Sequence, residues 1–454
     1  MDIIIIGAGI AGLSTALSLH QKCDRWTITV LERHDTLQAL GSVIGIMPSG
    51  TKVLRHLGLL DDVWRVCGDR KPVVNWRRWK DGSVLMTQTP PEREEMFGIR
   101  AATGKRADFQ KLLYDAAVKR GIAVRFNQYV ADVDETVPTV TLKTGEVITA
   151  DLIIAADGIN SATRRTLDPV SFQTFSGIDD YMTSIPCSVL EADPALQPLL
   201  TSANLWWGPT GCVIAGIAGV GSEERYYAEF CNINGNTGVQ GQWSQEADIA
   251  ELRTAFADWD PTLQALLGHV ESAKIWHLAY TQMGLDWVSQ SGKVVLIGDA
   301  AHAMLPHAMA GATTAIEDGA SLAECLSRAT SVAQIPRSLR AFAAIRRPRL
   351  AYIQSEGRNR SKMFHLPDGP AQQARDEMFK KNPMMGAPAW DGKHIDEPPS
   401  AKQRHLGMPY VVGHEAIDYT NRRLDDIWDK GEEALELKER WWDFSGGDPE
   451  LVSG

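Results

Sequence analysis

The chain has 454 residues, with 46 Lys and Arg against 57 Asp and Glu, and its formal net charge at pH 7 is −11. That length allows about three domains, and the acidic balance argues against nucleic acid or an anionic membrane surface as a partner, because both need a basic face. No run of about 18 apolar residues predicts a membrane span. The cysteines stand singly, without a Cys-x-x-Cys pair, so we expect reduced thiols in a cytoplasmic protein and neither a metal site nor a disulfide framework.

The chain opens with a strand, a glycine turn and a helix. Residues 2–6 are a short β-branched run typical of a buried parallel strand, residues 13–21 have a helical pattern, and residues 27–31 form a second apolar strand. Residues 7–12 are Gly-Ala-Gly-Ile-Ala-Gly, and Glu32 follows about 20 residues later. Such glycines let the backbone approach a pyrophosphate at the helix N-terminus, and the acid accepts ribose hydroxyls. The pattern predicts dinucleotide binding without separating FAD from NAD.

The rest of the chain changes character several times. As far as residue 155 we expect a helix over 48–60 that ends at Leu57-Gly58, sheet over 76–86, a helix over 108–120, a hairpin of 124–132 with 139–147, and a strand over 151–155. From 172 to 275, short β segments separated by Gly, Pro and Asn predict a mostly antiparallel sheet, with strands over 181–188, 212–220 and 225–231. Beyond it we expect a strand over 293–297, helices over 312–326 and 338–360, an irregular stretch over 366–411, and a charged helix over 419–442.

Two later motifs each follow a predicted strand. Asp157-Gly158 ends one apolar run, and Gly298-Asp299-Ala-Ala-His302 ends another. A carboxylate such as Asp299 at a strand end can accept ribityl hydroxyls, and N–H groups at the start of a helix at Gly311-Ala312 can face the pyrimidine edge of a flavin. Asp-Gly pairs are also common in hairpins, so it is the order and spacing of the motifs that favour FAD.

In this order the motifs resemble those of the group A flavoprotein monooxygenases, the para-hydroxybenzoate and salicylate hydroxylase family. The resemblance covers roughly residues 1–360 and rests on Gly7–Gly12, Glu32-Arg33, Arg106-Ala107-Asp108, Asp157-Gly158, Gly298-Asp299 through Pro306, and Gly311. Trp206-Trp207-Gly208-Pro209 and Arg346–Arg349 also resemble the salicylate-hydroxylase-like branch of that family.

The resemblance implies an α/β fold. It consists of a Rossmann-type FAD-binding domain, an inserted and mostly antiparallel β-sheet substrate domain, and a C-terminal helical segment. The implied FAD-binding parts are residues 1–75, 100–170 and 291–365, the substrate-domain parts are residues 76–99 and 171–290, and residues 366–454 form a C-terminal extension. The implied reaction is a hydroxylation or epoxidation, in which NAD(P)H reduces the flavin, O₂ forms a flavin hydroperoxide, and one oxygen atom passes to an aromatic or secondary-metabolite-like substrate.

The same resemblance assigns residues to the cofactor and the substrate. The expected FAD-binding residues are Gly7, Gly9, Ile10, Ala11, Gly12, Glu32, Arg33, Arg106, Asp157, Gly158, Asp299, Pro306, Gly311 and Ala312. A pocket that excludes water between the flavin and the sheet suits an apolar and aromatic lining. The candidates for that lining are Met182, Ser184, Trp206, Trp207, Cys212, Ile214 and Tyr227, and ordinary packing of the sheet is the alternative for each.

His307 and Tyr227 are the candidate catalytic residues. His307 follows Pro306 beside the expected flavin edge, where it could act as acid or base, and a structural histidine is the alternative. Met182 stands where many members of the family carry Arg, which disfavours a substrate carboxylate at that point. The cluster Arg346–Arg349 is expected to form ion pairs with the surface of the FAD-binding part.

The chain is therefore expected to be an enzyme, a monomer or a homodimer, that takes a small-molecule substrate and O₂. NAD(P)H is expected to approach a small basic patch formed by Arg100, Arg164 or Arg165. The alternatives are a flavin oxidase or dehydrogenase, a flavin halogenase and, from another class, a flavin-binding protein without turnover. Residues 206–209 do not match the Trp-x-Trp-x-Ile-Pro signature of halogenases, which disfavours that alternative.

Overall fold

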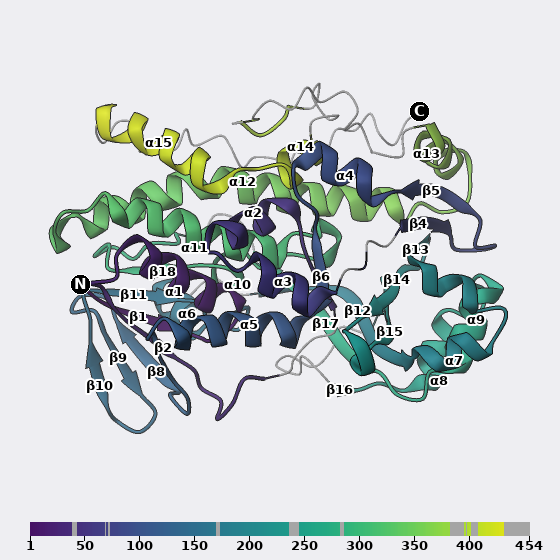
Figure 1. Ribbon diagram of the computed structural model, residues 1–454, viewed down its shortest axis with the longest axis horizontal. Helices are drawn as coiled ribbons and strands as arrows, with labels where there is room; N and C mark the ends of the chain where they lie inside the picture. Colours follow the sequence, from purple (N-terminus) through teal and green to yellow (C-terminus); the bar gives the residue numbers. More distant parts are fainter. Residues whose placement is uncertain are drawn as a thin grey trace.

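The computed structural model describes residues 1–38, 43–68, 70, 73–168, 173–235, 245–281, 286–381, 395, 397–400 and 407–430. Two large β-sheets lie side by side, and the long helix α12 (Ile335–Phe364) runs along both of them (Figure 1). Within the described ranges, no helix is long and apolar enough to cross a lipid bilayer.

The first sheet is parallel, and its described strands have the order β18–β11–β1–β2–β7. They are β1 (Asp2–Ile6), β2 (Thr27–Leu31), β7 (Ala123–Arg125), β11 (Leu152–Ala155) and β18 (Val294–Leu296). The apolar runs of β1 and β11 are buried almost throughout, because layers cover both faces of this sheet. The strands predicted over 2–6, 27–31, 151–155 and 293–297 are confirmed to within a residue or two.

Alternate residues of β1 pack into different layers. Ile3 and Ile5 pack with a helical layer, whereas Ile4 and Ile6 pack with a layer of antiparallel strands. The helical layer contains α1 (Ile10–Lys22), α5 (Arg106–Lys119) and α11 (Gly311–Ser327), and the strand layer contains β8 (Val130–Asp134), β9 (Thr139–Leu142) and β10 (Val147–Thr149). Successive strand residues point to opposite faces, so one continuous apolar run serves two layers.

The predicted hairpin of 124–132 with 139–147 is wrong in its first strand. The first part of that segment forms β7, which pairs in parallel with β2 of the first sheet. The antiparallel partner of β9 is β8, and β10 adds a third strand. Between β7 and β8 the chain turns at Asn127, whose φ of 58° lies in the left-handed region that Asn tolerates. A run of β-forming residues does not by itself reveal that its two ends belong to different sheets.

The second sheet is antiparallel except for the β13–β4 pair among its described strands, and it confirms the prediction for residues 172–275. In sheet order the strands are β16 (Gln245–Glu246), β17 (Lys274–Thr281), β12 (Gln173–Pro186), β15 (Arg225–Asn232), β14 (Gly211–Ala218), β13 (Ser202–Gly208), β4 (Val73–Arg78) and β5 (Val84–Gln88). The helices α7 (Cys187–Ala192), α8 (Ile249–Ala255) and α9 (Pro261–Gly268) lie on one face. The opposite face, called the inner face below, meets the C-terminal end of α12 through Phe364.

Shorter elements connect the two sheets. They are β3 (Val43–Ile46), which pairs with β6 (Ala102–Lys105), the helices α2 (Pro48–His56), α3 (Leu60–Cys67), α4 (Pro90–Phe97), α6 (Ala162–Leu167) and α10 (Asp299–His302), and the 3-10 turn η3 (Pro306–Ala308). The helix predicted over 48–60 ends at His56, before the Leu57-Gly58 pair, as expected.

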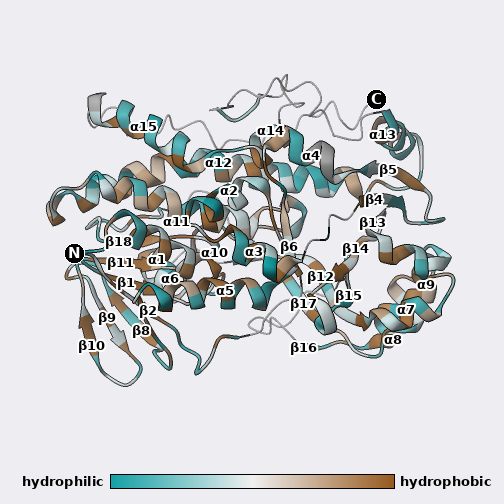
Figure 2. Cartoon of the chain, in the orientation of Figure 1, coloured by the Kyte–Doolittle hydropathy of each residue, from teal (hydrophilic) through white to brown (hydrophobic). Residues whose placement is uncertain are grey.

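The stretch 366–411, which was expected to be irregular, contains two helices. They are α13 (Pro370–Lys381) and α14 (Gly407–Val412). The buried side of α13 is mostly polar, since Arg375 donates to Asp376 and to the carbonyl oxygen of Phe364. Figure 2 shows α13 as mostly hydrophilic, which explains why no apolar period predicts it.

The last described helix is α15 (Ala416–Lys430). It confirms the first half of the helix predicted over 419–442, and the second half lies outside the described residues. Leu424 and Ile427 of α15 pack into the same core as α11. The helix α15 therefore covers part of the helical layer of the first sheet.

A buried charge cluster joins α11 to α12. Arg346 pairs with Glu317 and Asp318, each at 2.9 Å, and Arg349 pairs with Glu317 at 2.8 Å. All four side chains are buried. The ion pairs predicted for Arg346–Arg349 therefore form, but those of Arg346 and Arg349 lie in the interior, whereas Arg347 pairs at 3.5 Å with Asp286, which is exposed. Burial alone would raise the pKa of Glu317, but the charges of Arg349 and Arg346 hold it well below its usual range. Asp318 also accepts from His302 Nε2 at 2.5 Å and from the Gly298 N–H at 3.0 Å.

Glu317→Gln should lower the free energy of unfolding by about 3–5 kcal/mol, because it leaves buried guanidinium groups without their full countercharge. Urea denaturation measures the loss. The control is Asp115→Asn, which breaks the exposed Lys111–Asp115 pair and should cost about 0–1 kcal/mol. Equal losses for the two variants would contradict the assignment.

The same pair predicts a pH dependence. Because the folded-state pKa of Glu317 is depressed, its stabilising effect is present above the unfolded value of about 4.3 and is lost as the pH falls below it. The difference in unfolding free energy between the wild type and Glu317→Gln should therefore shrink below about pH 4. A difference that stays constant with pH would contradict the ionised state of Glu317.

Candidate functional site

The first glycine motif forms a tight turn between β1 and α1. Gly7 has a φ of 105°, and a Cβ there would lie 2.5 Å from the carbonyl oxygen of Ala156. A Cβ at Gly12 would lie 2.0 Å from the carbonyl oxygen of Gly7. Gly9 differs, because a Cβ there would meet nothing within 4 Å. The first and third glycines therefore permit the turn, and the middle one leaves open space at the start of α1, beside Ile10 and Ala11.

Glu32 reinforces this turn from the end of β2. Its carboxylate accepts the backbone N–H of Ala8 at 2.9 Å and that of His34 at 3.0 Å. The side chain of Arg33 is exposed and donates to His34. Both predicted residues thus lie beside the glycine turn, where an adenosine ribose is expected.

Asp157 and Gly158 follow β11 and lead into α6. Asp157 Oδ2 accepts the N–H groups of Ala162 at 3.0 Å and Thr163 at 3.3 Å, while its Oδ1 is buried without a hydrogen-bond partner among the described residues. Gly158 has a φ of 77°. The carboxylate therefore shapes its own turn and keeps one oxygen for another partner.

Arg164 lies behind this turn and not on the surface. It is 1% exposed, and it donates to the carbonyl oxygens of Ala300 at 3.0 Å and Ile159 at 2.5 Å. It links the Asp157 turn to the Asp299 turn. The expectation that Arg164 forms part of a basic patch for NAD(P)H is wrong, because its guanidinium is enclosed, whereas Arg165 has an exposed side chain.

Asp299 is exposed in a segment whose neighbours are buried. Gly298 before it has a φ of 56°, and a Cβ there would lie 2.8 Å from the side chain of Ala11. Burial lowers the pKa of Arg106, and the charge of Asp299 raises it, so the two predicted FAD residues are electrostatic neighbours. The turn after β18 therefore presents a carboxylate at the start of α1.

The turn η3 and the start of α11 complete the site. Pro306 is exposed, Met309 has a φ of 54°, and a Cβ at Gly311 would meet nothing within 4 Å. A Cβ at Gly319 would lie 2.8 Å from Thr15 Cα, so α11 and α1 pack closely. A Cβ at Gly298 would lie 2.8 Å from Ala11 Cβ and 3.5 Å from Ala315 Cβ, so the first turns of both helices lie at the carboxyl end of β18.

These residues fit FAD. Open space at Gly9 suits a pyrophosphate at the N-terminus of α1, the exposed Asp299 suits ribityl hydroxyls, and the open backbone at Gly311 suits the edge of the flavin ring. The two helix N-termini supply N–H groups toward negative charge. An acidic protein can thus hold a phosphate-rich cofactor without a basic surface.

The inner face of the second sheet contains most of the predicted substrate residues. Met182, Glu229 and Ile214 are register partners across β12, β15 and β14. Asp180, Cys231, Cys212 and Trp207 form the next row, and Ser184 pairs with Tyr227 in a row on the other side. Glu229 and Cys231 were not predicted, although alternation along β15 from Tyr227 places them on the same face.

The structure does not bring Trp206 to the inner face. Its side chain lies on the opposite face, fully buried, and Nε1 donates to Asp260 Oδ2 at 2.7 Å. Adjacent strand residues point to opposite faces, so of the two neighbouring tryptophans only Trp207 faces inward. We therefore leave Trp206 out of the proposed substrate site.

His307 lies in a buried cluster with two other side chains. Its Nε2 is 3.0 Å from His365 Nε2, and His365 Nδ1 donates to the carbonyl oxygen of Gly208 at 2.9 Å. The pKa of the Cys212 thiol lies well below its usual range. A hydrogen bond with Cys231 lowers this pKa most, and hydrogen bonds with His307 and His365 lower it further, whereas burial raises it. His365 was missed in the sequence because it carries no motif and ends α12, far along the chain from η3.

Tyr227 lies away from this cluster. It is four residues from Cys231 on β15, which corresponds to about 13 Å along a strand. Burial raises its pKa, while Lys105 and Arg225 lower it. The two predicted catalytic residues are thus at opposite ends of the inner face.

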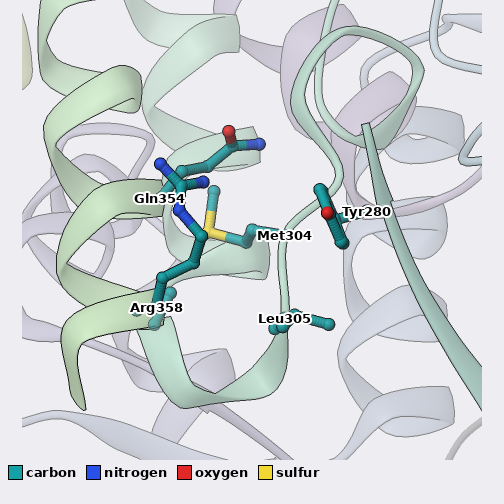
Figure 3. Close-up of a pocket in the computed structure, with 7 residues that line it drawn as sticks. Tyr280, Met304, Leu305, Gln354 and Arg358 are labelled. Carbon is teal, nitrogen blue, oxygen red and sulfur yellow. The ribbon is translucent and has the colours of Figure 1, made fainter. Parts of the chain in front are cut away.

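A pocket lies beside η3, between the turn and α12. It is lined by Tyr280, Met304, Leu305, Ala308, Gln354, Gly357 and Arg358 (Figure 3). Gln354 and Arg358 are one helical turn apart and lie on the same side of α12. A Cβ at Gly357 would lie 2.9 Å from Ala308 Cβ, so the helix and the turn approach closely here.

Known proteins share these features. The FAD binding domain family matches residues 1–354. The chain is 30% identical over 425 residues to the FAD-dependent monooxygenase OpS4 of Beauveria bassiana, which covers 92% of this chain and 96% of that protein. It is also 30% identical over 385 residues to 3-amino-4-hydroxybenzoate 2-monooxygenase of Streptomyces cremeus, which covers 83% of this chain and 91% of that protein.

Solved structures agree on the fold. A substrate complex of salicylate hydroxylase superposes with a TM-score of 0.72 and 24% identity, covering 90% of this chain and 98% of that one. CtdE in complex with FAD and a substrate superposes with a TM-score of 0.77 and 21% identity, covering 95% and 99%. The chain belongs to the FAD-binding family of flavin-dependent monooxygenases, whose group A members its motifs resemble.

Proposed function

We propose that this monooxygenase hydroxylates an electron-rich aromatic ring held between the flavin ring and the inner face of the second sheet. The observation that carries the proposal is the inner face itself, where Met182 and Ile214 share one row and Trp207 lies in the next, its ring centroid 6.5 Å from that of His307 in η3. Residues at the glycine turn, Asp299 and Gly311 would hold FAD, and the flavin, reduced by NAD(P)H, would supply the chemistry by which one atom of O₂ enters the ring and the other leaves as water. The sheet orients the ring and excludes water.

The apolar side chain of Met182 favours a ring without a carboxylate opposite it, because it gives an anion no partner. The register partners of Met182 are Glu229 on β15 and Lys274 on β17, so this row carries both signs of charge. A phenol, aminophenol or indole meets the requirement. The relative from Streptomyces cremeus is named for a benzoate that carries amino and hydroxyl groups, which supports an aromatic substrate for this chain. We propose that the substrate of this chain differs by lacking the carboxyl group.

We assign proton transfer to His307 and ring positioning to Tyr227. Because His365 Nδ1 donates to a carbonyl, neutral His365 accepts at Nε2, and His307 donates there. That arrangement leaves a lone pair on His307 Nδ1, which is buried without a partner among the described residues. A substrate hydroxyl could give its proton to this atom, which would make the ring more electron-rich.

The cytoplasmic location, the monomeric or homodimeric state and the six segment boundaries predicted from the sequence stay predictions. Size-exclusion chromatography coupled to light scattering, applied to the flavin-loaded enzyme, would determine the oligomeric state.

Asp299→Ala should cost most of the bound flavin, because the variant loses the carboxylate proposed to hold the ribityl hydroxyls. The ratio of flavin to protein absorbance after purification measures the loss. The control is Asp115→Ala, which removes an exposed carboxylate from α5 and should keep full flavin content. Full occupancy in Asp299→Ala would remove this residue from the FAD site.

Oxidation of NADPH and NADH should be stimulated by a member of a phenol, indole and anthranilate panel, and mass spectrometry should show the gain of one oxygen atom. Gain of chlorine would move the assignment to a halogenase, and oxidation without oxygen insertion to an oxidase or dehydrogenase. Bound flavin without turnover on any panel member would favour a non-catalytic flavin protein.

Met182→Arg should change the preference toward benzoates, because the new guanidinium can pair with a carboxylate. We expect a KM for salicylate or anthranilate at least about tenfold lower than in the wild type, which is about 1.4 kcal/mol. Met182→Leu keeps the volume without the charge and should leave the preference unchanged. An unchanged ratio of kcat/KM values in Met182→Arg would separate Met182 from the substrate site.

A further inference from the structure

We propose that Cys212, His307 and His365 form a binding site for a thiophilic divalent cation of the zinc class. The side chains come from β14, the η3 turn and the residue that ends α12. Their ligand atoms all lie within 4.8 Å of one another. Cys212 is 2% exposed and His307 is 4% exposed, so the cluster lies in the interior.

The hydrogen bond to Gly208 orients His365 as a ligand. Its Nδ1 carries the hydrogen, because a carbonyl oxygen can only accept, and its Nε2 is left with a lone pair toward the other two side chains. Histidines that bind metals usually donate their other ring N–H to a carbonyl or a carboxylate, which fixes the tautomer and the ring. The geometry supplies that support before any ion binds.

The distances suit a tetrahedral ion. Zinc–nitrogen bonds of about 2.0–2.1 Å at a tetrahedral angle separate two nitrogens by about 3.3 Å. The two Nε2 atoms are 3.0 Å apart, so a shift of a few tenths of an ångström would admit the ion between them. Sulfur and imidazole ligands select zinc-class ions over Mg²⁺ and Ca²⁺, which prefer oxygen.

Two further buried groups support a cation here. Cys231 is the register partner of Cys212, and its thiol donates to Asp180 Oδ1 at 3.3 Å. The carboxyl group of Asp180, held by the register partner of Cys212, can offset the charge of the ion. A buried cation without such compensation would be costly.

Metal binding and proton transfer exclude each other at His307. An ion on Nε2 displaces the hydrogen that this atom donates to His365, and Nδ1 then carries the ring hydrogen and cannot accept one. Metal binding would thus withdraw His307 from proton transfer and hold η3 against the sheet. The site itself does not depend on the proposed substrate, so it can be tested without one.

The experiment measures metal content and coordination in the flavin-loaded enzyme. After dialysis against metal-free buffer and titration with Zn²⁺ against a chromophoric chelator, we expect about one tightly bound equivalent, with one sulfur and two imidazoles by X-ray absorption at the zinc edge. Cys212→Ser and His365→Gln should each weaken zinc affinity by at least about tenfold, the lower limit of the effect expected when a metal site loses a contributing side chain. Flavin content equal to that of the wild type shows that each variant is folded.

The control variant is Cys187→Ser, which removes a thiol on α7, outside the cluster. It should bind zinc like the wild type. The proposal is overturned if the wild type binds no equivalent at micromolar zinc, if Cys212→Ser binds as tightly as the wild type, or if the absorption spectrum contains no sulfur shell. Zinc binding with these ligands would stand even if no aromatic substrate is turned over, and its absence would leave the proposed hydroxylation intact.

Discussion

The interaction on which the rest of the structure depends is the buried pairing of the Glu317-Asp318 pair on α11 with Arg346 and Arg349 on α12. Asp318 also holds the Gly298 N–H and His302, so the same carboxylate fixes the turn that presents Asp299. Burying ions costs desolvation free energy, which is offset only when each ion has well-placed partners. Here each carboxylate accepts from more than one donor. These pairs fix relative positions, because they hold together the end of β18, the helix that begins at Gly311 and the helix that ends at His365.

Close backbone packing extends that frame to the glycine turn. Gly319 brings α11 against Thr15, and Gly298 brings the Asp299 turn against Ala11, so the starts of α1 and α11 share one edge of the parallel sheet. Both starts have open space where a side chain would stand. The proposed FAD site therefore consists of N–H groups and one carboxylate on rigid elements, which would let a chain of net charge −11 hold two phosphates.

The inner face of the second sheet is the proposed substrate surface. Along each strand, residues that face this surface alternate with residues that pack against α7, α8 and α9. Neighbouring residues in the chain therefore contribute to opposite faces of the sheet. Met182 lies between Glu229 and Lys274 in the middle row, while Cys212 and His307 form a polar end against η3. A substrate beside this end would lie next to a group able to take a proton, and a soft metal ion bound there would remove that ability.

The sequence by itself determined the cofactor and much of the fold, since a strand, its glycine turn and the following helix are contiguous and their spacing reflects local geometry. It could not predict α13, whose buried side is polar, nor the break between β7 and β8. Only the tertiary structure decided that Trp207 and not Trp206 faces inward, and that Arg164 is enclosed. The sequence also predicted no metal site, because its cysteines stand singly, without a Cys-x-x-Cys pair. Cys212, His307 and His365 meet only because α12 returns its end to the sheet. Contacts between residues that distant depend on how whole elements pack, and local patterns contain no record of that packing.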